Sequence, residues 1–384
     1  MSSCKKMKIG IITYHRACNY GAFLQARALC NRLNRENDLE AEIIDFRMKR
    51  ELLLYSVDRC KWTLNLKRIV RQRFFFEKKL FDSFEKAQNA DLAPKSGRYL
   101  LSDQMKDFQE LVRNQYDVII AGSDEIWKVN SFRGFPTPYW LMGDLGCRKF
   151  AYAASARVAF KECLDAEKLR ELKAALDDFE FIGVRDQLTY DAVKDITSEK
   201  KKVQMCCDPS FLYDFAIDKK KTMDMVIGHK LDKTKKNILL MVEDRKLVAC
   251  IVKKLKKNHN LISVFHKHRG CINVPGLSPI QWLEALCASD MILTSYFHAS
   301  CYSILLEKSF ISVGTKLKKT KLEELLFENE ELRAHYIDLS KHNYQTIDWE
   351  TCVKESKYQI FPENYVEKKR EGFLNFLNAL RDSK

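Results

Sequence analysis

The 384-residue sequence lacks the features that mark membrane-spanning proteins, repeat proteins, P-loop enzymes and zinc proteases. No run approaches the ~18 consecutive apolar residues that a membrane-spanning helix needs. No tandem repeat of a solenoid or propeller is visible, and there is no P-loop, Gly-x-Gly-x-x-Gly fingerprint or His-Glu-x-x-His motif. These absences argue against a transmembrane protein and a repeat protein, and they leave no motif for a P-loop enzyme or a zinc protease.

The cysteine pattern is equally informative. The chain has 13 cysteines, an odd number, and no Cys-x-x-Cys pair, so we expect reduced thiols rather than a disulfide scaffold. The segment from Met1 to Gly10 places charge before a short apolar stretch and lacks the apolar core of a signal peptide. We therefore expect a cytoplasmic protein, with at most peripheral contact with the inner face of the cell membrane.

Positive charge is in excess. Lys and Arg total 66 against 52 Asp and Glu, a formal charge of +14, which favours an anionic substrate, an anionic surface or nucleic acid as a partner. No nucleic acid partner is expected, because the basic residues are dispersed and no RRM, KH or zinc-finger spacing occurs. Residues 59–79 hold eight Lys or Arg among apolar side chains, with only Glu77 opposing them. This pattern is typical of a basic amphipathic helix, which lies on an anionic membrane or packs its apolar side on its own domain.

Short apolar runs alternate with helical patterns from end to end, which predicts βαβ units and parallel sheets. With 46% hydrophobic residues, the length suits two domains of ~190 residues. The fold class expected is α/β with two Rossmann-like domains, and the polar, Lys-rich stretch 214–236 is the predicted linker. The expected bounds are an N-terminal domain over 1–213 with a helical insertion at about 50–115, and a C-terminal domain over 237–384 that ends in helices.

In open parallel sheets, ligands bind outside the carboxyl ends of the strands, so the residues that follow predicted strands are the candidates. Asn19 and Gly21 follow the first strand and suit either an anion site at a helix start or an ordinary N-cap. Asp124 follows Gly-Ser and is a candidate base, or an Asx contact in a turn. Arg185 is a candidate ligand of carboxylate or phosphate, or the partner of a nearby acid. His298 opens a predicted helix after a buried strand. It is a candidate contact for an anionic substrate, or a residue with a purely structural role.

His266 and His268 form a His-x-His pair after another predicted strand. Lys267 and Arg269 flank the pair, and no carboxylate lies nearby in the sequence. A metal site is therefore not expected here.

Six motifs follow one another in a characteristic order. They are Gly10 to His15 with Asn19 to Leu29, Tyr116 to Trp127, Ala151 to Ser155, Gly183 to Asp186, Cys207 to Pro209 and Thr294 to Ala299. In order and approximate spacing they resemble the polysaccharide pyruvyl transferase family. The resemblance implies two Rossmann-like domains facing each other across a cleft, similar to the GT-B arrangement. It also implies transfer of pyruvate from phosphoenolpyruvate to a sugar as a cyclic ketal, with phosphoenolpyruvate as donor substrate and no separate cofactor.

The same resemblance implies roles for the candidates: His298 as acid or phosphate contact, Arg185 as phosphoenolpyruvate anchor, Asp124 as acceptor-side carboxylate, and Asn19, Gly21 and Ser295 as lining residues. The sequence departs from the pattern at Tyr296, where some ketal-forming members have arginine. It departs again at Ala156 and Arg157, where a glycine often stands, and Arg157 is a candidate to supply the lost charge.

We therefore expect a pyruvyl transferase that acts on a sugar of a surface polysaccharide or of its lipid-linked precursor. Two alternatives stay open. One is a GT-B-like glycosyltransferase that uses a nucleotide sugar, and the other is a non-catalytic binding protein of a polysaccharide assembly complex.

Overall fold

The chain forms two compact units. The computed structural model describes residues 5–49, 51, 71–130, 134–198, 201–214, 216–315 and 318–382, without the side chains of 71–75. The first unit contains the described residues up to 51, those from 86 to 214 and those from 367 to 382, and the second contains 71–85 and 216–366. Of the predicted amphipathic helix at 59–79, residues 59–70 lie outside the described residues, and 71–79 belong to α4 (Arg71–Asp91).

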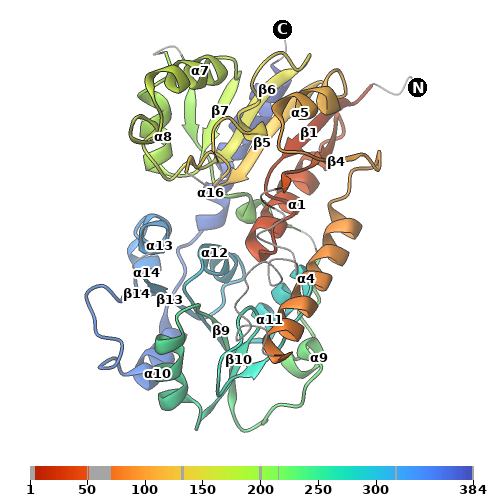
Figure 1. Cartoon of the computed structure of the whole chain (residues 1–384). Coiled ribbons are helices and arrows are strands. Elements are labelled where there is room, and N and C mark those ends of the chain that lie inside the picture. The colour runs from red at the N-terminus through yellow and green to blue at the C-terminus, as the bar shows by residue number, and fades with distance from the viewer. Residues whose placement is uncertain are drawn as a thin grey trace. The chain divides into compact units, whose positions relative to one another are not determined.

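The first unit is built on a sheet of six parallel strands in the order β2-β1-β5-β6-β7-β8 (Figure 1). The strands are β1 (Met7–Ile12), β2 (Leu39–Ile43), β5 (Val118–Asp124), β6 (Arg148–Ala154), β7 (Phe181–Val184) and β8 (Val203–Met205). β5 and β6 are apolar and buried along almost their whole length, as expected of parallel strands covered on both faces. The chain runs from β1 outward to β2 and then returns to the other side of β1 with β5. This reversal creates a topological switch point between β1 and β5.

The remaining elements of this unit cover the sheet or extend its edge. The helices are α1 (Tyr20–Asn34), α5 (Met105–Val112), α6 (Phe160–Cys163), α7 (Ala166–Asp177), α8 (Gln187–Lys194) and the 3-10 turns η2 (Pro138–Trp140) and η3 (Pro209–Leu212), and the short strands are β3 (Asp45–Arg47) and β4 (Tyr99–Leu101). α1 packs against β2, β5 and η3. Leu24, Ala28 and Leu29 of α1 are fully buried, which confirms the apolar stripe that its sequence contains.

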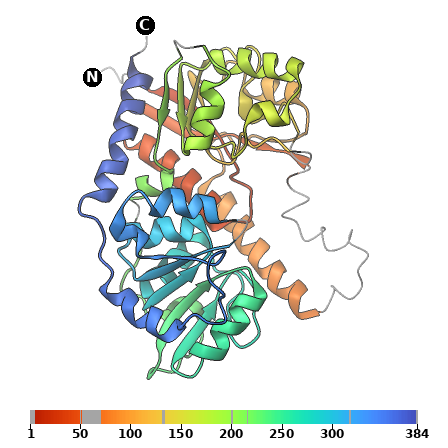
Figure 2. The same cartoon turned by 90° about the vertical axis from the view of Figure 1, so that its left-hand side faces the viewer.

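The second unit repeats this construction, with six parallel strands in the order β11-β10-β9-β12-β13-β14 (green to blue in Figure 2). The strands are β9 (Lys236–Met241), β10 (His259–Ser263), β11 (Ile272–Asn273), β12 (Met291–Thr294), β13 (Phe310–Gly314) and β14 (Tyr336–Asp338). The helices are α9 (Met223–Ile227), α10 (Arg245–Leu255), α11 (Pro279–Ala288), α12 (Phe297–Leu305), α13 (Lys319–Leu326), α14 (Glu330–Arg333), α15 (Trp349–Glu355) and the 3-10 turn η4 (Ser356–Tyr358). The switch point of this sheet lies between β9 and β12.

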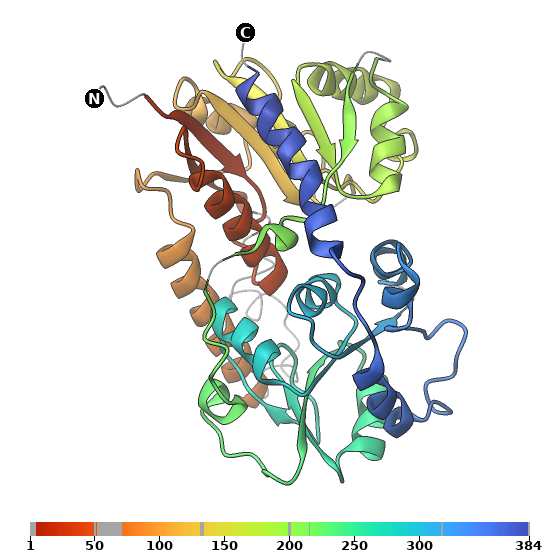
Figure 3. The same ribbon diagram turned by 180° about the vertical axis from the view of Figure 1, so that it is seen from behind.

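The C-terminal helix differs from the predicted domain bounds. α16 (Tyr365–Arg381) falls within the predicted C-terminal domain, 237–384. From Glu367 on, however, it belongs to the first unit. Its Phe376 packs on Tyr152 of β6, with ring centroids 4.8 Å apart, and Arg148 donates to the carbonyl of Leu380 at 2.8 Å. Figure 3 shows α16, in dark blue, lying along the first sheet. The burial of these aromatic side chains holds the helix there.

The stretch predicted as a linker contains a helix that packs on the second unit. Within 214–236, α9 packs against α11, and Lys221 pairs at 2.6 Å with Glu284, whose side chain is only 6% exposed. Most of the predicted linker is thus part of the second unit. None of the helices in the described ranges has the length and apolar content to cross a bilayer.

Candidate functional site

The carboxyl ends of β1 and β5 are joined side by side at the first switch point. The hydroxyl of Thr13, just after β1, donates to the carbonyl of Ser123 at 3.2 Å and accepts from the amide nitrogen of Gln25 at 3.0 Å. Gln25 is fully buried, and its Oε1 has no hydrogen-bond partner within the described part of the chain. These contacts fix the edge of the sheet on which Asp124 stands.

Asn19 caps α1. Its Oδ1 accepts from the N–H groups of Gly21 at 2.8 Å and Ala22 at 3.2 Å, and Gly21 lies buried in the first turn. The arrangement is that of an N-cap, which satisfies donors at the helix start. Substrate contact by Asn19 and Gly21 stays a prediction.

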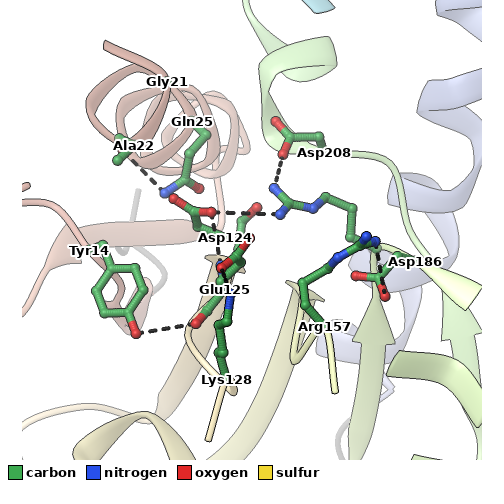
Figure 4. A network of polar contacts seen from close by, with 12 residues as sticks. Tyr14, Gly21, Ala22, Gln25, Asp124, Glu125, Lys128, Arg157, Asp186 and Asp208 are labelled. Atoms are coloured by element: carbon green, nitrogen blue, oxygen red, sulfur yellow. Dashed lines mark hydrogen bonds and ion pairs between the residues drawn. The ribbon is translucent and has the colours of Figure 1, made fainter. Parts of the chain in front are cut away.

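Asp124 ends β5 in a left-handed conformation, with φ of 69°, which is uncommon for a residue other than glycine. Its Oδ1 accepts from the N–H of Glu125 at 2.9 Å and lies 3.6 Å from Nη2 of Arg185. The side chain is 16% exposed. Asp124 therefore combines an Asx-type contact with an ion pair, and its carboxylate reaches the carboxyl edge of the sheet (Figure 4).

Arg185 is buried between carboxylates. Its Nη1 donates to Oδ2 of Asp208 at 2.6 Å, and its side chain is 7% exposed. Burial alone would lower the pKa of this guanidinium, but the charges of Asp208 and Asp124 outweigh it and raise the pKa above its ordinary value. Arg185 therefore orders the two carboxylates at the ends of β5 and β8, an interaction that the sequence reasoning left open as one of two alternatives.

Arg157 follows β6 and also has a left-handed backbone, with φ of 58°. Its guanidinium lies 3.9 Å from Asp186, which caps α8 through the N–H of Thr189. Ala153 has φ of 54°, where the pairing of β6 with β7 shifts in register. Three left-handed residues other than glycine thus gather at this edge, and strain of this kind concentrates at functional sites. Figure 4 shows Arg157 and Asp124 projecting from the ends of neighbouring strands.

In the second unit, the predicted residues follow β12 at the other switch point. Ser295 is buried, and its N–H donates to the carbonyl of Met241 at 2.9 Å. The N–H of Tyr296 donates to Oγ1 of Thr294 at 2.9 Å, and Tyr296 precedes α12 without a side-chain cap. His298 stands in the first turn of α12, as the sequence predicted. The structure therefore brings Ser295, Tyr296 and His298 to one edge of this sheet.

Tyr296 is the centre of a polar cluster that the sequence reasoning missed. Its hydroxyl and Nε2 of His266 share a hydrogen bond of 2.5 Å, and Nζ of Lys318 lies 3.5 Å from its ring centroid. Lys318 in turn pairs with Glu243 at 3.0 Å. Each member of the cluster follows a different strand: Glu243 follows β9, His266 follows β10, Tyr296 follows β12 and Lys318 follows β13. These strands are neighbours in the sheet. His266 was already noted after its strand, and the same rule applied after β9 and β13 would also have found Glu243 and Lys318.

Burial shifts the protonation of this cluster. It lowers the pKa of His266 to about 4, with Glu243 opposing the shift, so the imidazole is neutral at pH 7. It lowers the pKa of Lys318 as well, again against the effect of Glu243. Burial raises the pKa of the Tyr296 hydroxyl. The cluster therefore has a neutral hydrogen-bonding side and a cationic side.

The His-x-His pair does not converge on one point. His266 contacts Tyr296, whereas Nε2 of His268 lies 2.9 Å from the carbonyl oxygen of Val242. Their ring centroids are 6.0 Å apart. Across the ranges that the structure describes, no group of three or more His, Cys, Asp or Glu is arranged to hold a metal ion.

A second group that the sequence reasoning did not single out surrounds Asp45. This buried carboxylate accepts from Nε2 of His15 at 2.9 Å, from Arg16 and from Nε of Arg47 at 2.8 Å. Burial would raise the pKa of Asp45, but the hydrogen bonds from Arg47, His15 and Arg16 lower it well below its usual range. The cluster fixes the loop after β1.

The comparisons with known proteins agree with this construction. A UDP-GlcNAc 2-epimerase from Neisseria meningitidis bound to UDP-GlcNAc superposes with a TM-score of 0.57 at 9% identity, over 98% of this chain and 100% of that chain. A UDP-GlcNAc 2-epimerase from Methanocaldococcus jannaschii superposes with a TM-score of 0.52 at 10% identity, over 97% and 99%. At such identities the likeness concerns the fold alone. A comparison of the sequence with curated proteins gave no match.

Two parallel six-stranded sheets, each with polar residues at the carboxyl edge of its switch point, define a GT-B-like fold of two Rossmann-like domains. The sequence profile of the polysaccharide pyruvyl transferase family matches residues 19–316, which is more than three quarters of the 384 residues. The chain therefore belongs to the polysaccharide pyruvyl transferase family.

Proposed function

We propose that the protein transfers pyruvate from phosphoenolpyruvate to a sugar of a surface polysaccharide, or of its lipid-linked precursor, as a ketal. The observation that carries the proposal is the extent of the family match, 19–316, which covers most of the carboxyl edges of both sheets. Those edges carry a carboxylate at Asp124, a histidine at His298 and cations at Arg157 and Lys318.

The reaction needs these residue types. A proton adds to the methylene carbon of phosphoenolpyruvate, and C2 becomes electrophilic. Two sugar hydroxyls then form bonds to C2 while its bond to the phosphate oxygen breaks. Of the two hydroxyl protons, one balances the proton gained by the methyl group and the other leaves with inorganic phosphate. Such a sequence calls for an acid, a base and donors to the anionic groups.

We assign Asp124 as the base for an acceptor hydroxyl, because it is an ordered carboxylate at a sheet edge. We assign His298 as the acid or the phosphate contact. Arg157, 11% exposed and opposite Asp186, is the first-unit candidate for donor binding. Arg185, already held by two carboxylates, is assigned to keep Asp124 ordered, and its second assignment is an anchoring contact with phosphoenolpyruvate.

The test is incubation with phosphoenolpyruvate and a panel of lipid-linked and free glycosides, followed by phosphate release and by mass spectrometry of a pyruvate ketal. Asp124→Asn should lower turnover by about 10²–10⁴-fold, and asparagine tolerates the left-handed backbone at this position. His298→Ala should abolish turnover, whereas His229→Ala, at an exposed position, should leave it unchanged. Wild-type rates in both site variants would refute the assignments.

Thermal-shift titration separates the alternatives, since a ligand that binds the native state raises the melting temperature. Stabilisation by phosphoenolpyruvate supports pyruvyl transfer. Stabilisation by UDP- or GDP-sugars alone supports a glycosyltransferase. No shift with either, together with retained partner or liposome association that depends on the charges of 59–79, supports a non-catalytic binding protein.

A further inference from the structure

Lys318 occupies an unusual position for a lysine. It follows β13 and lies against the face of the Tyr296 ring, with Nζ 3.5 Å from the centroid. Its side chain is 27% exposed, whereas that of its ion-pair partner Glu243 is 64% exposed. The lysine is therefore the desolvated member of the pair, and the acid stands largely in water.

An ion pair with so exposed an acid contributes little to stability. It does not explain why the chain holds an ammonium group in a partly dry site, where burial disfavours the charged form. An ammonium has three donors. Glu243 takes one, and the ring of Tyr296 attracts the charge through its π face, so the group can still donate to a ligand.

The surrounding charges favour an anion. The charges of Lys318 and Arg245 both lower the pKa of His266, and Glu243 is the acid that opposes them. With His266 neutral, the two cations exceed the single carboxylate. The hydroxyl of Tyr296, fixed by His266 at 2.5 Å, adds an oriented polar group on the same side.

We propose that Lys318 and Tyr296 form an anion-binding site of the second unit, in which a phosphate or carboxylate group displaces Glu243 from the ammonium of Lys318. The proposal rests on the proposed function only for the identity of the ligand, which would be phosphoenolpyruvate. Lys318 binds the anion, Glu243 holds the lysine in place when the site is empty, and His266 is a positioning residue for Tyr296.

The test is titration calorimetry of the full chain with phosphoenolpyruvate and, separately, with inorganic phosphate. Lys318→Met should weaken binding of both by about tenfold or more, as expected for loss of a charge-assisted contact, and Lys318→Arg should restore most of it. The matched control is Lys319→Met, because the adjacent Lys319 pairs with Asp338 instead. This variant should bind both anions as the wild type does. Glu243→Gln should bind the anions at least as tightly as the wild type.

The outcomes are distinguishable. Wild-type affinity for both anions in a folded Lys318→Met variant overturns the site, even if pyruvyl transfer proceeds. If phosphate binds through Lys318 but no ketal forms with any acceptor, the site stands and the proposed function fails. A wild-type protein that binds neither anion overturns both.

Discussion

Nη2 of Arg185 lies 3.6 Å from Oδ1 of Asp124, while Nη1 of the same guanidinium lies 2.6 Å from Oδ2 of Asp208. One buried cation thus joins the carboxyl ends of two strands that are not adjacent in the sheet, β5 and β8. Two carboxylates at this edge would repel each other without it. Arg185 therefore secures the geometry of the proposed base.

Replacing Arg185 should cost stability as well as activity. Arg185→Met removes the guanidinium that pairs with Asp208, 1% exposed, and removal of one partner of a buried pair costs about 3–5 kcal/mol. Urea unfolding followed by circular dichroism measures the loss. Arg381→Met, which breaks more exposed pairs with Glu36 and Asp38, should cost about 1 kcal/mol or less. Equal losses in the two variants would contradict the role of Arg185.

The backbone at Arg157 makes a separate prediction. Because its φ of 58° is left-handed, Arg157→Gly relieves a penalty that Arg157→Ala retains, so the glycine variant should be more stable by about 1 kcal/mol. Both variants remove the same guanidinium, and both should therefore lose the same affinity for phosphoenolpyruvate. Equal melting temperatures for the two variants would show that the position carries no backbone strain.

His266 should make stability depend on pH. Its pKa falls from 6.5 to about 4 in the folded protein, so between these values the unfolded chain binds more protons than the native state. The contribution is fully present above pH 6.5 and is lost as the pH falls toward 4. Urea midpoints at about pH 7 and about pH 4.5 should therefore differ less in His266→Gln than in the wild type.

The charges that act on His266 are those of Glu243, His268, Lys318 and Arg245, and the comparison with the wild type keeps all of them. His342→Gln, at an exposed position, serves as the control and should show the wild-type difference between the two pH values. A His266→Gln variant that keeps the full wild-type difference would be inconsistent with a buried, neutral His266.

The C-terminal helix should be needed for the first unit. Phe376 is fully buried among Phe150, Tyr152 and Phe181, and Phe376→Ala should cost about 3–5 kcal/mol. Leu374 on the same helix is 54% exposed, and Leu374→Ala should change the unfolding free energy by about 0.5 kcal/mol or less. Urea unfolding of the two variants is the measurement. Similar small effects would mean that α16 is dispensable.

Local pattern predicted much of the fold. Both units show the alternation of strands and helices that the sequence predicts, because a buried apolar run such as Phe181–Val184 or a capped amphipathic stretch such as Pro279–Ala288 is readable within one window. The linker was harder. The stretch 214–236 is mostly polar, so its composition does not reveal the few apolar side chains, such as Met223 and Val226, that α9 buries.

The sequence by itself determined the alternation of strands and helices, the family, and the placement of Asp124, Arg185, Tyr296 and His298 at the carboxyl ends of their strands. The tertiary structure decided the partners. That Arg185 meets Asp208, that Lys318 lies on Tyr296 and that α16 returns to β6 depends on contacts between residues that are distant in the chain. The periodicity of apolar residues shows which face of a helix or strand is apolar. Which elements then pack together depends on the strand order of the sheet and on burial in the folded chain.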